Sequence, residues 1–213
     1  MGRAVTSGAD SDSQSLLRSY YEREAELEVR TGPRGQRVDV RANFIALLDA
    51  EGRQSVVDFG SGPGHDGEAF IAAGVRFVGV DLAVGNARLG RANGLRIIPA
   101  SITAPPIRAG SFEAGWSMST LMHLPAEEAA AAVEAMSSCL EADAPLTVGV
   151  WGSHVGRDVE SRAIEGERRP FHLRTADQNR RLLSAAGEIQ WATVWDAGPE
   201  DWEYQVFRVR VSA

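Results

Sequence analysis

The stretch VVDFGSGPGHDGEAF, from Val56 to Phe70, decides the fold of this 213-residue chain. It begins with apolar residues typical of a buried strand, passes through a glycine cluster and continues into a helical pattern. Gly60, Gly62 and Gly64 allow the backbone to turn sharply and to approach a ligand where a β-carbon would collide with it. The stretch therefore predicts a strand, a ligand-binding loop and a helix in succession.

The same alternation continues after this stretch. The sequence predicts strands at 55–59, 76–81, 95–100, 112–118 and 145–151 and helices at about 65–73, 84–93, 126–140 and 175–186. Strands that alternate with helices in this way are typical of a parallel sheet covered on both faces. Two later segments, 188–196 and 202–211, alternate apolar and polar residues and predict an antiparallel hairpin that closes the sheet.

The chain before the first strand predicts two helices, within residues 13–50, after a polar tail at 1–12. We read the first helix, over about 13–29, as packing loosely on the main body. We assign the remaining residues, 53–213, to the core of a single domain, because the length suits one α/β core. The chain shows neither a signal-peptide pattern nor an apolar run long enough to cross a bilayer, so we expect a soluble cytoplasmic protein without a membrane partner.

The amino-acid composition excludes several classes of partner and mechanism. The formal net charge of −7 argues against a nucleic-acid partner and favours a small-molecule substrate. All 22 basic residues are arginines, which excludes lysine Schiff bases and a Walker phosphate loop. A single cysteine, Cys139, forms neither an internal disulfide nor a cysteine-cluster metal site, so we expect it in the core and expect no metal. The sequence does not indicate the oligomeric state.

The glycine cluster satisfies two ligand-binding patterns. GSGPG is a G-x-G-x-G loop, whereas GPGHDG, from Gly62 to Gly67, also satisfies the dinucleotide pattern G-x-G-x-x-G. Asp58 precedes the loop by two residues, where a carboxylate disfavours a pyrophosphate and favours a ligand with cationic groups. Asp81 ends the next strand about twenty residues later, a separation at which a carboxylate accepts hydrogen bonds from ribose in either case.

Several motifs in order resemble the class I S-adenosylmethionine-dependent methyltransferases, in particular the small bacterial members of the methyltransferase-11/25 type. They are VVDFGSGPG, GVDLA, PASITAPPIRAGSFEAGWSMSTLMHLP and LLSAAGEI, and together they span most of the chain. The resemblance implies a Rossmann-like, doubly wound, seven-stranded, mostly parallel sheet with an antiparallel C-terminal hairpin and N-terminal lid helices. It implies S-adenosylmethionine as the cofactor.

The resemblance also assigns roles to residues along the cofactor. Ser101 stands where similar proteins usually carry an acid, and its hydroxyl is a weaker acceptor for the adenine amino group. Tyr21 matches a tyrosine of the lid helix in such enzymes. The full set of expected cofactor-binding residues is Tyr21, Asp58, Gly60, Ser61, Gly62, Asp81, Leu82, Ser101, Ile102 and Ser117.

Methyl transfer needs a general base only where the acceptor must lose a proton. His154 follows the predicted strand at 145–151 and is our first candidate base, with His123 of the LMHLP stretch as the second. We expect transfer to oxygen or nitrogen of a small-molecule acceptor. The alternatives are an NAD-dependent oxidoreductase and a non-catalytic S-adenosylmethionine-binding partner subunit.

Overall fold

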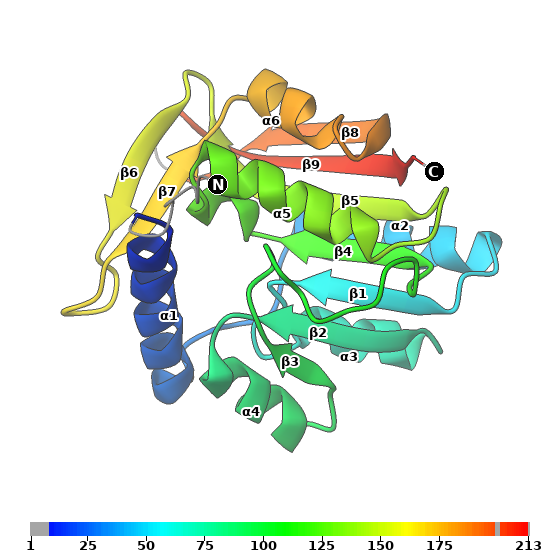
Figure 1. The fold of residues 1–213 in the computed structure, drawn as a ribbon, viewed down its shortest axis with the longest axis horizontal. Coiled ribbons are helices and arrows are strands. Elements are labelled where there is room, and N and C mark those ends of the chain that lie inside the picture. The colour runs from blue at the N-terminus through cyan, green and yellow to red at the C-terminus, as the bar shows by residue number, and fades with distance from the viewer. Residues whose placement is uncertain (1–8, 199–200, 213) are drawn as a thin grey trace, which may run out of the picture.

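A seven-stranded sheet forms the centre of the molecule (Figure 1). The computed structural model describes residues 9–198 and 201–212, with side chains from Ser13 onward. The strand order is β3-β2-β1-β4-β5-β9-β8. These strands are β1 (Ser55–Phe59), β2 (Arg76–Asp81), β3 (Ile97–Pro99), β4 (Ala114–Met118), β5 (Pro145–Ser153), β8 (Gly187–Asp196) and β9 (Trp202–Val211). The first five are parallel to one another, and β9 pairs antiparallel with both β5 and β8.

Helices cover both faces of this sheet (Figure 1). They are α1 (Ala9–Leu27), α2 (Gln36–Ala50), α3 (His65–Ala72), α4 (Val84–Ala92), α5 (Ala126–Ser138) and α6 (Ala176–Leu183), with a 3₁₀ turn η1 (Leu121–His123) after β4. The predicted fold class is therefore confirmed. The central strands could be predicted because they are buried on both faces and rich in apolar residues, and all five residues of β1 and of β4 are buried.

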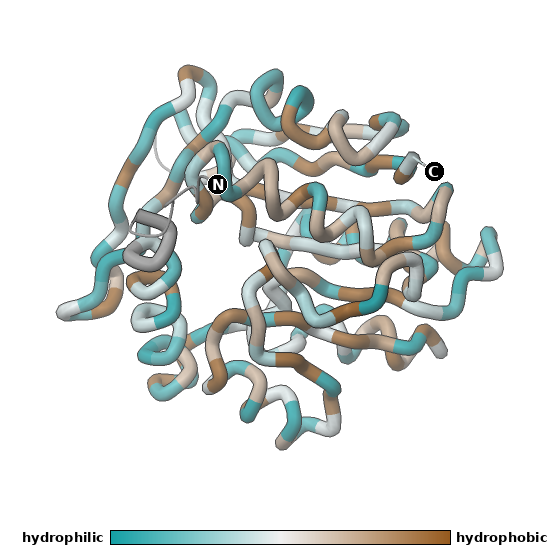
Figure 2. Tube along the Cα trace, viewed as in Figure 1, coloured by the Kyte–Doolittle hydropathy of each residue, from teal (hydrophilic) through white to brown (hydrophobic). Residues whose placement is uncertain are grey.

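Two apolar cores lie on opposite faces of the sheet. Val57 and Phe59 of β1 pack against residues of α5 such as Val133, while Val56 packs on the other face with Phe44 of α2 and Phe70 of α3. Figure 2 shows brown, apolar segments along the central strands between more polar outer helices. Cys139 is buried, as expected from sequence, and Trp116 is buried as well.

The N-terminal region differs in detail from the prediction. Helix α1 begins at Ala9, within the predicted tail, and residues 1–8 lie outside the described residues. Of the two expected lid helices, α1 lines the main pocket described below, whereas α2 reaches only the adjoining polar hollow, through Arg37. Helix α2 belongs to the core, because its Val40, Phe44 and Leu48 are buried against the sheet.

The segment between β5 and α6, for which no strand or helix was predicted, contains a hairpin. Strands β6 (Arg157–Ser161) and β7 (Arg169–Leu173) pair antiparallel as a separate two-stranded sheet. The period-two signal is weak here because β6 has one apolar residue, Val159, and buries no residue fully. Among the described residues, no helix is both long and apolar enough to span a membrane.

Candidate functional site

A pocket lies where the strand order reverses, at the carboxyl ends of β1, β2 and β4. It encloses about 550 Å³ of empty space, its open mouth included. Seven of the residues expected from sequence line it, namely Tyr21, Gly60, Asp81, Leu82, Ser101, Ile102 and His123. Residues from α1, the loops after β1 to β4, and η1 thus meet around one hollow.

The glycine loop brings its backbone against the floor of this pocket. Gly60 has a φ of 80°, and a β-carbon there would collide with the Thr120 side chain. Gly62 has a φ of 56°, and its β-carbon would lie 3.2 Å from the guanidinium of Arg30. Positive φ and close packing together explain why glycine is required at both positions.

Asp81 is held rigidly at the end of β2. Its Oδ2 accepts a hydrogen bond of 2.7 Å from the backbone N–H of Gly62. Its Oδ1 accepts 3.0 Å bonds from the backbone of Ala83 and from the side chain of Asn86. The carboxylate is 7% exposed and remains at the pocket wall. Asn86 was not anticipated, since only the fold of α4 turns it back toward the strand end.

A second, polar hollow adjoins the glycine loop. It is lined by Arg30, Arg37, Asp58, Ser61 and Asp66, among others. Burial, with added repulsion from Asp66 and Asp81, raises the pKa of Asp58 well above its usual range, despite the opposing effect of nearby arginines. Sequence reasoning found Asp58 and Ser61 but missed both arginines, which lie in an irregular segment and the start of α2.

Two polar groups of this hollow have no hydrogen-bond partner among the described residues. The Nε of Arg37 is buried without a hydrogen bond, although its guanidinium lies over the Tyr204 ring. The carboxyl of Asp58, a residue only 2% exposed, interacts electrostatically with Arg30 and Arg37 but is hydrogen-bonded to no described residue. By contrast, Asp66 is fully engaged, because it accepts bonds from Arg41 at 2.8 Å and from the indole of Trp116 at 3.1 Å. Buried groups of opposite charge with unused hydrogen-bonding capacity favour a ligand that carries both signs.

Tyr21 and His123 form a hydrogen-bonded pair at the other end of the pocket. His123 Nδ1 lies 2.8 Å from the carbonyl oxygen of Pro170, so Nδ1 carries the proton. Nε2 therefore accepts the 2.7 Å hydrogen bond from the Tyr21 hydroxyl. Burial lowers the pKa of His123 to about 3, with further lowering by Arg169 and Arg30. Burial also raises the pKa of Tyr21, so both side chains are neutral at pH 7.

Ser119, which the sequence reasoning missed, lines the pocket where Ser117 was expected. Ser117 is fully buried within β4, and its hydroxyl donates a 2.8 Å hydrogen bond to the carbonyl of Phe59. Ser119 is the first residue after β4, and its hydroxyl lies 3.0 Å from that of Tyr204. Its φ of 59° is rare for a residue other than glycine. The two residues differ because one lies inside the sheet and the other beyond its edge.

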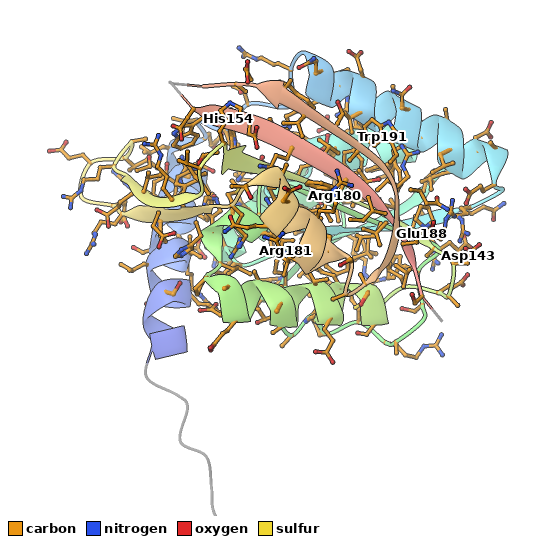
Figure 3. The ribbon with its side chains drawn as sticks, turned by 90° about the horizontal axis from the view of Figure 1, so that it is seen from above. Asp143, His154, Arg180, Arg181, Glu188 and Trp191 are labelled. Atoms are coloured by element: carbon orange, nitrogen blue, oxygen red, sulfur yellow. The ribbon has the colours of Figure 1, made fainter. Side chains whose placement is uncertain are left out.

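His154 lies apart from the pocket. Its side chain is 54% exposed, with Nδ1 3.0 Å from Glu203 and Nε2 3.5 Å from Asp196 (Figure 3). It does follow β5, as expected, but the antiparallel strand β9 begins beside it and holds it there. The structure therefore does not bring the two candidate bases together.

Residues 56–143 match the sequence profile of a family described as a methyltransferase domain. This segment runs from β1 to the turn before β5 and includes the glycine loop, Asp81 and His123. Residues 56–143 of the chain thus carry a methyltransferase domain, in agreement with the resemblance of the sequence motifs. A comparison with curated proteins found no match.

Solved structures share the fold of this methyltransferase. A 1,6-didemethyltoxoflavin-N1-methyltransferase from Burkholderia thailandensis, bound to 1,6-didemethyltoxoflavin and S-adenosylhomocysteine, has a TM-score of 0.74 and 20% identity, covering 100% of this chain and 94% of its own. Magnesium protoporphyrin IX methyltransferase from Synechocystis PCC 6803, bound to S-adenosylmethionine, has a TM-score of 0.66 and 14% identity, covering 99% and 100%. The [4+2]-cyclase SpnF has a TM-score of 0.69 and 14% identity, covering 94% and 96%. At these identities the likeness establishes the fold, and the fold hosts more than one reaction.

Proposed function

We propose that this protein transfers the methyl group of S-adenosylmethionine to a small-molecule acceptor, at an oxygen or nitrogen atom. The observation that carries the proposal lies beside the glycine loop, where the Asp58 carboxyl and the Arg37 Nε have no hydrogen bond within the described residues. The cofactor has an ammonium and a carboxylate at one end, so one group suits each partner. A dinucleotide would instead bring phosphates toward Asp58.

The remaining contacts follow along the pocket. Asp81 would accept hydrogen bonds from the ribose hydroxyls, and Ser101 with Ile102 would flank the adenine. Arg30 borders both hollows and would join Arg37 at the carboxylate. When bound, S-adenosylmethionine supplies an electrophilic methyl group on a sulfonium. With the adenosyl and amino-acid ends so placed, the side of the pocket formed by η1 and α1 is left for the acceptor.

His123 does not serve as the general base in this proposal. Its Nδ1–H donates a hydrogen bond to the carbonyl oxygen of Pro170, and its Nε2 accepts one from the Tyr21 hydroxyl. Its pKa of about 3 also makes it a poor proton acceptor at neutral pH. Its role is to fix the Tyr21 hydroxyl. The acceptor therefore reacts through a lone pair that needs no deprotonation by this histidine, such as a neutral ring nitrogen or an oxygen already ionised.

Helix α1 gives the reason for a small acceptor. Gln14, Leu17 and Tyr21 of this helix line the pocket and lie across it from the sheet. Such a cover excludes water and positions the two reactants, and positioning supplies much of the acceleration in this kind of transfer. A macromolecular acceptor would have to displace it.

The experiment begins with calorimetry of the wild-type protein with S-adenosylmethionine, S-adenosylhomocysteine and NAD. We expect micromolar binding of the first two and none of NAD. Asp58→Asn and Arg37→Met should each weaken cofactor binding at least about tenfold, as expected for hydrogen bonds to charged groups. Arg96→Met, at an exposed arginine beyond the pocket lining, is the matched control and should bind like wild type.

Transfer itself is then measured with methyl-labelled cofactor and a panel of small nitrogen heterocycles and acidic phenols. Labelled product from either class supports the proposal. Cofactor binding without transfer to any acceptor would favour the non-catalytic binding subunit, and binding of NAD alone would reject the assignment of the glycine loop.

A further inference from the structure

Glu22 of α1 contacts the start of α4 through both of its carboxylate oxygens. Oε1 accepts a 2.6 Å hydrogen bond from the backbone N–H of Val84, and Oε2 accepts a 2.8 Å bond from that of Gly85. Helix α4 begins at Val84, and its own N-cap residue, Ala83, has no side chain that could cap it. A residue of α1 thus caps a helix some sixty positions further along the chain, where a negative charge also complements the helix dipole.

Gly85 shows that the two helices are built to meet at this point. A β-carbon on Gly85 would lie 2.8 Å from the β-carbon of Ala25 and 2.8 Å from Glu22 Oε2. The φ of Gly85 is not positive, so backbone conformation does not call for glycine there. The close approach of α1 therefore explains why the first turn of α4 has a glycine at this position. Figure 1 shows the C-terminal end of α1 beside the start of α4.

This contact adjoins the cofactor pocket on both sides. Asp81 and Leu82, which line the pocket, come directly before the start of α4, and Tyr21 directly precedes Glu22. Tyr21 bonds to His123 on the opposite wall. Two successive residues of α1 therefore hold it to the two walls between which the pocket lies.

We propose that Glu22 is a latch, a positioning residue that holds α1 over the bound cofactor, and that cofactor exchange requires its contact with α4 to break. The inference rests on the proposed function, since it takes the Asp81 end of the pocket to hold the ribose. Glu22 does not itself line the pocket. It acts through the position of α1 alone.

The test compares Glu22→Gln with Glu26→Gln. Glutamine keeps the length of the side chain but loses the charge and turns an amide N–H₂ toward one of the two backbone donors. Glu26, one turn further along α1, is the matched control, because its side chain is 65% exposed and its ion pair is with Arg23 of the same helix. The dissociation rate of S-adenosylhomocysteine is measured by stopped-flow displacement, and thermal unfolding is followed in parallel.

We expect Glu22→Gln to release S-adenosylhomocysteine about tenfold faster than wild type, and Glu26→Gln at the wild-type rate. Gly85→Ala should speed release as well, because its methyl group displaces α1 from the other side. Combined with Glu22→Gln it should add little, since both changes break one contact. Gly85→Ala also keeps the test valid if Glu22→Gln folds poorly.

A wild-type release rate in both Glu22→Gln and Gly85→Ala would overturn the latch. So would equal acceleration by Glu26→Gln, or a lowered unfolding temperature without faster release, which would indicate a structural cap only. Failure of the wild-type protein to bind S-adenosylhomocysteine would be a different result, because it would reject the proposed function and the latch together.

Discussion

Protonation of His123 should make the protein lose stability in mild acid. The pKa of this buried histidine is about 3 in the folded protein against 6.5 in the unfolded chain. Between these two values the unfolded chain binds one proton that the folded protein does not, so stability is fully present above pH 6.5 and falls as the pH falls toward 3. Each pH unit within this window costs about 1.4 kcal/mol, which amounts to about 2.5 kcal/mol between pH 7 and pH 4.5.

The assay is urea unfolding at several pH values from 7 to 4.5, for wild type, His123→Asn and Tyr21→Phe. Asparagine keeps a donor near Pro170 but does not titrate, so its profile should lack this loss of about 2.5 kcal/mol. Tyr21→Phe should retain most of the loss, because burial is the largest cause of the lowered pKa. Parallel profiles for wild type and His123→Asn would refute the reasoning and return His123 to consideration as a base.

Three further predictions test the site. Asp81→Asn should weaken S-adenosylhomocysteine binding about 10- to 100-fold in calorimetry, as for charged hydrogen bonds of about 1.5–3 kcal/mol, and an unchanged affinity would remove Asp81 from the ribose. Ser119→Ala should lower cofactor affinity or turnover while Ser117→Ala lowers only the unfolding temperature, and the reverse pattern would restore the original assignment. Gly60→Ala and Gly74→Ala share a φ of 80°, so both should lose about 1–2 kcal/mol of stability, but only Gly60→Ala collides with Thr120 and should also abolish cofactor binding. Equal binding by these two variants would show that close packing at Gly60 is unimportant.

The parts of the site that sequence reasoning reached are those fixed by the sheet. Asp81 and the glycine loop directly follow parallel strands, and the ends of such strands meet at one edge whatever the loops do. Their positions could therefore be predicted from the order of the elements alone. Ser117 shows the limit of this argument, because the strand ends at Met118 as predicted, yet Ser117 is bonded inside the sheet and Ser119, just beyond the strand, lines the pocket.

The residues that sequence reasoning missed are placed by contacts between distant segments. Arg30 and Arg37 lie in and after an irregular connection whose path depends on where α1 and α2 pack. His154 follows a parallel strand and so met the same criterion as Asp81, yet pairing of β5 with β9 brings Glu203 to it and keeps it out of the pocket. No local pattern distinguishes the two cases.

The two ends of the site differ in ionisation, and this difference should make cofactor binding release a proton. Tyr21 and His123 satisfy each other and stay neutral, whereas Asp58 is buried beside Asp66 and Asp81 with its pKa raised well above the usual range. An ammonium group arriving next to Asp58 favours its ionised form and lowers that pKa, so binding should release a proton and affinity should rise with pH until Asp58 ionises unaided. Calorimetry in buffers of different ionisation enthalpy should detect the proton, and Asp58→Asn should abolish its release. A binding enthalpy independent of the buffer would mean that Asp58 is already ionised before the cofactor arrives, and that the arginines beside it outweigh its burial.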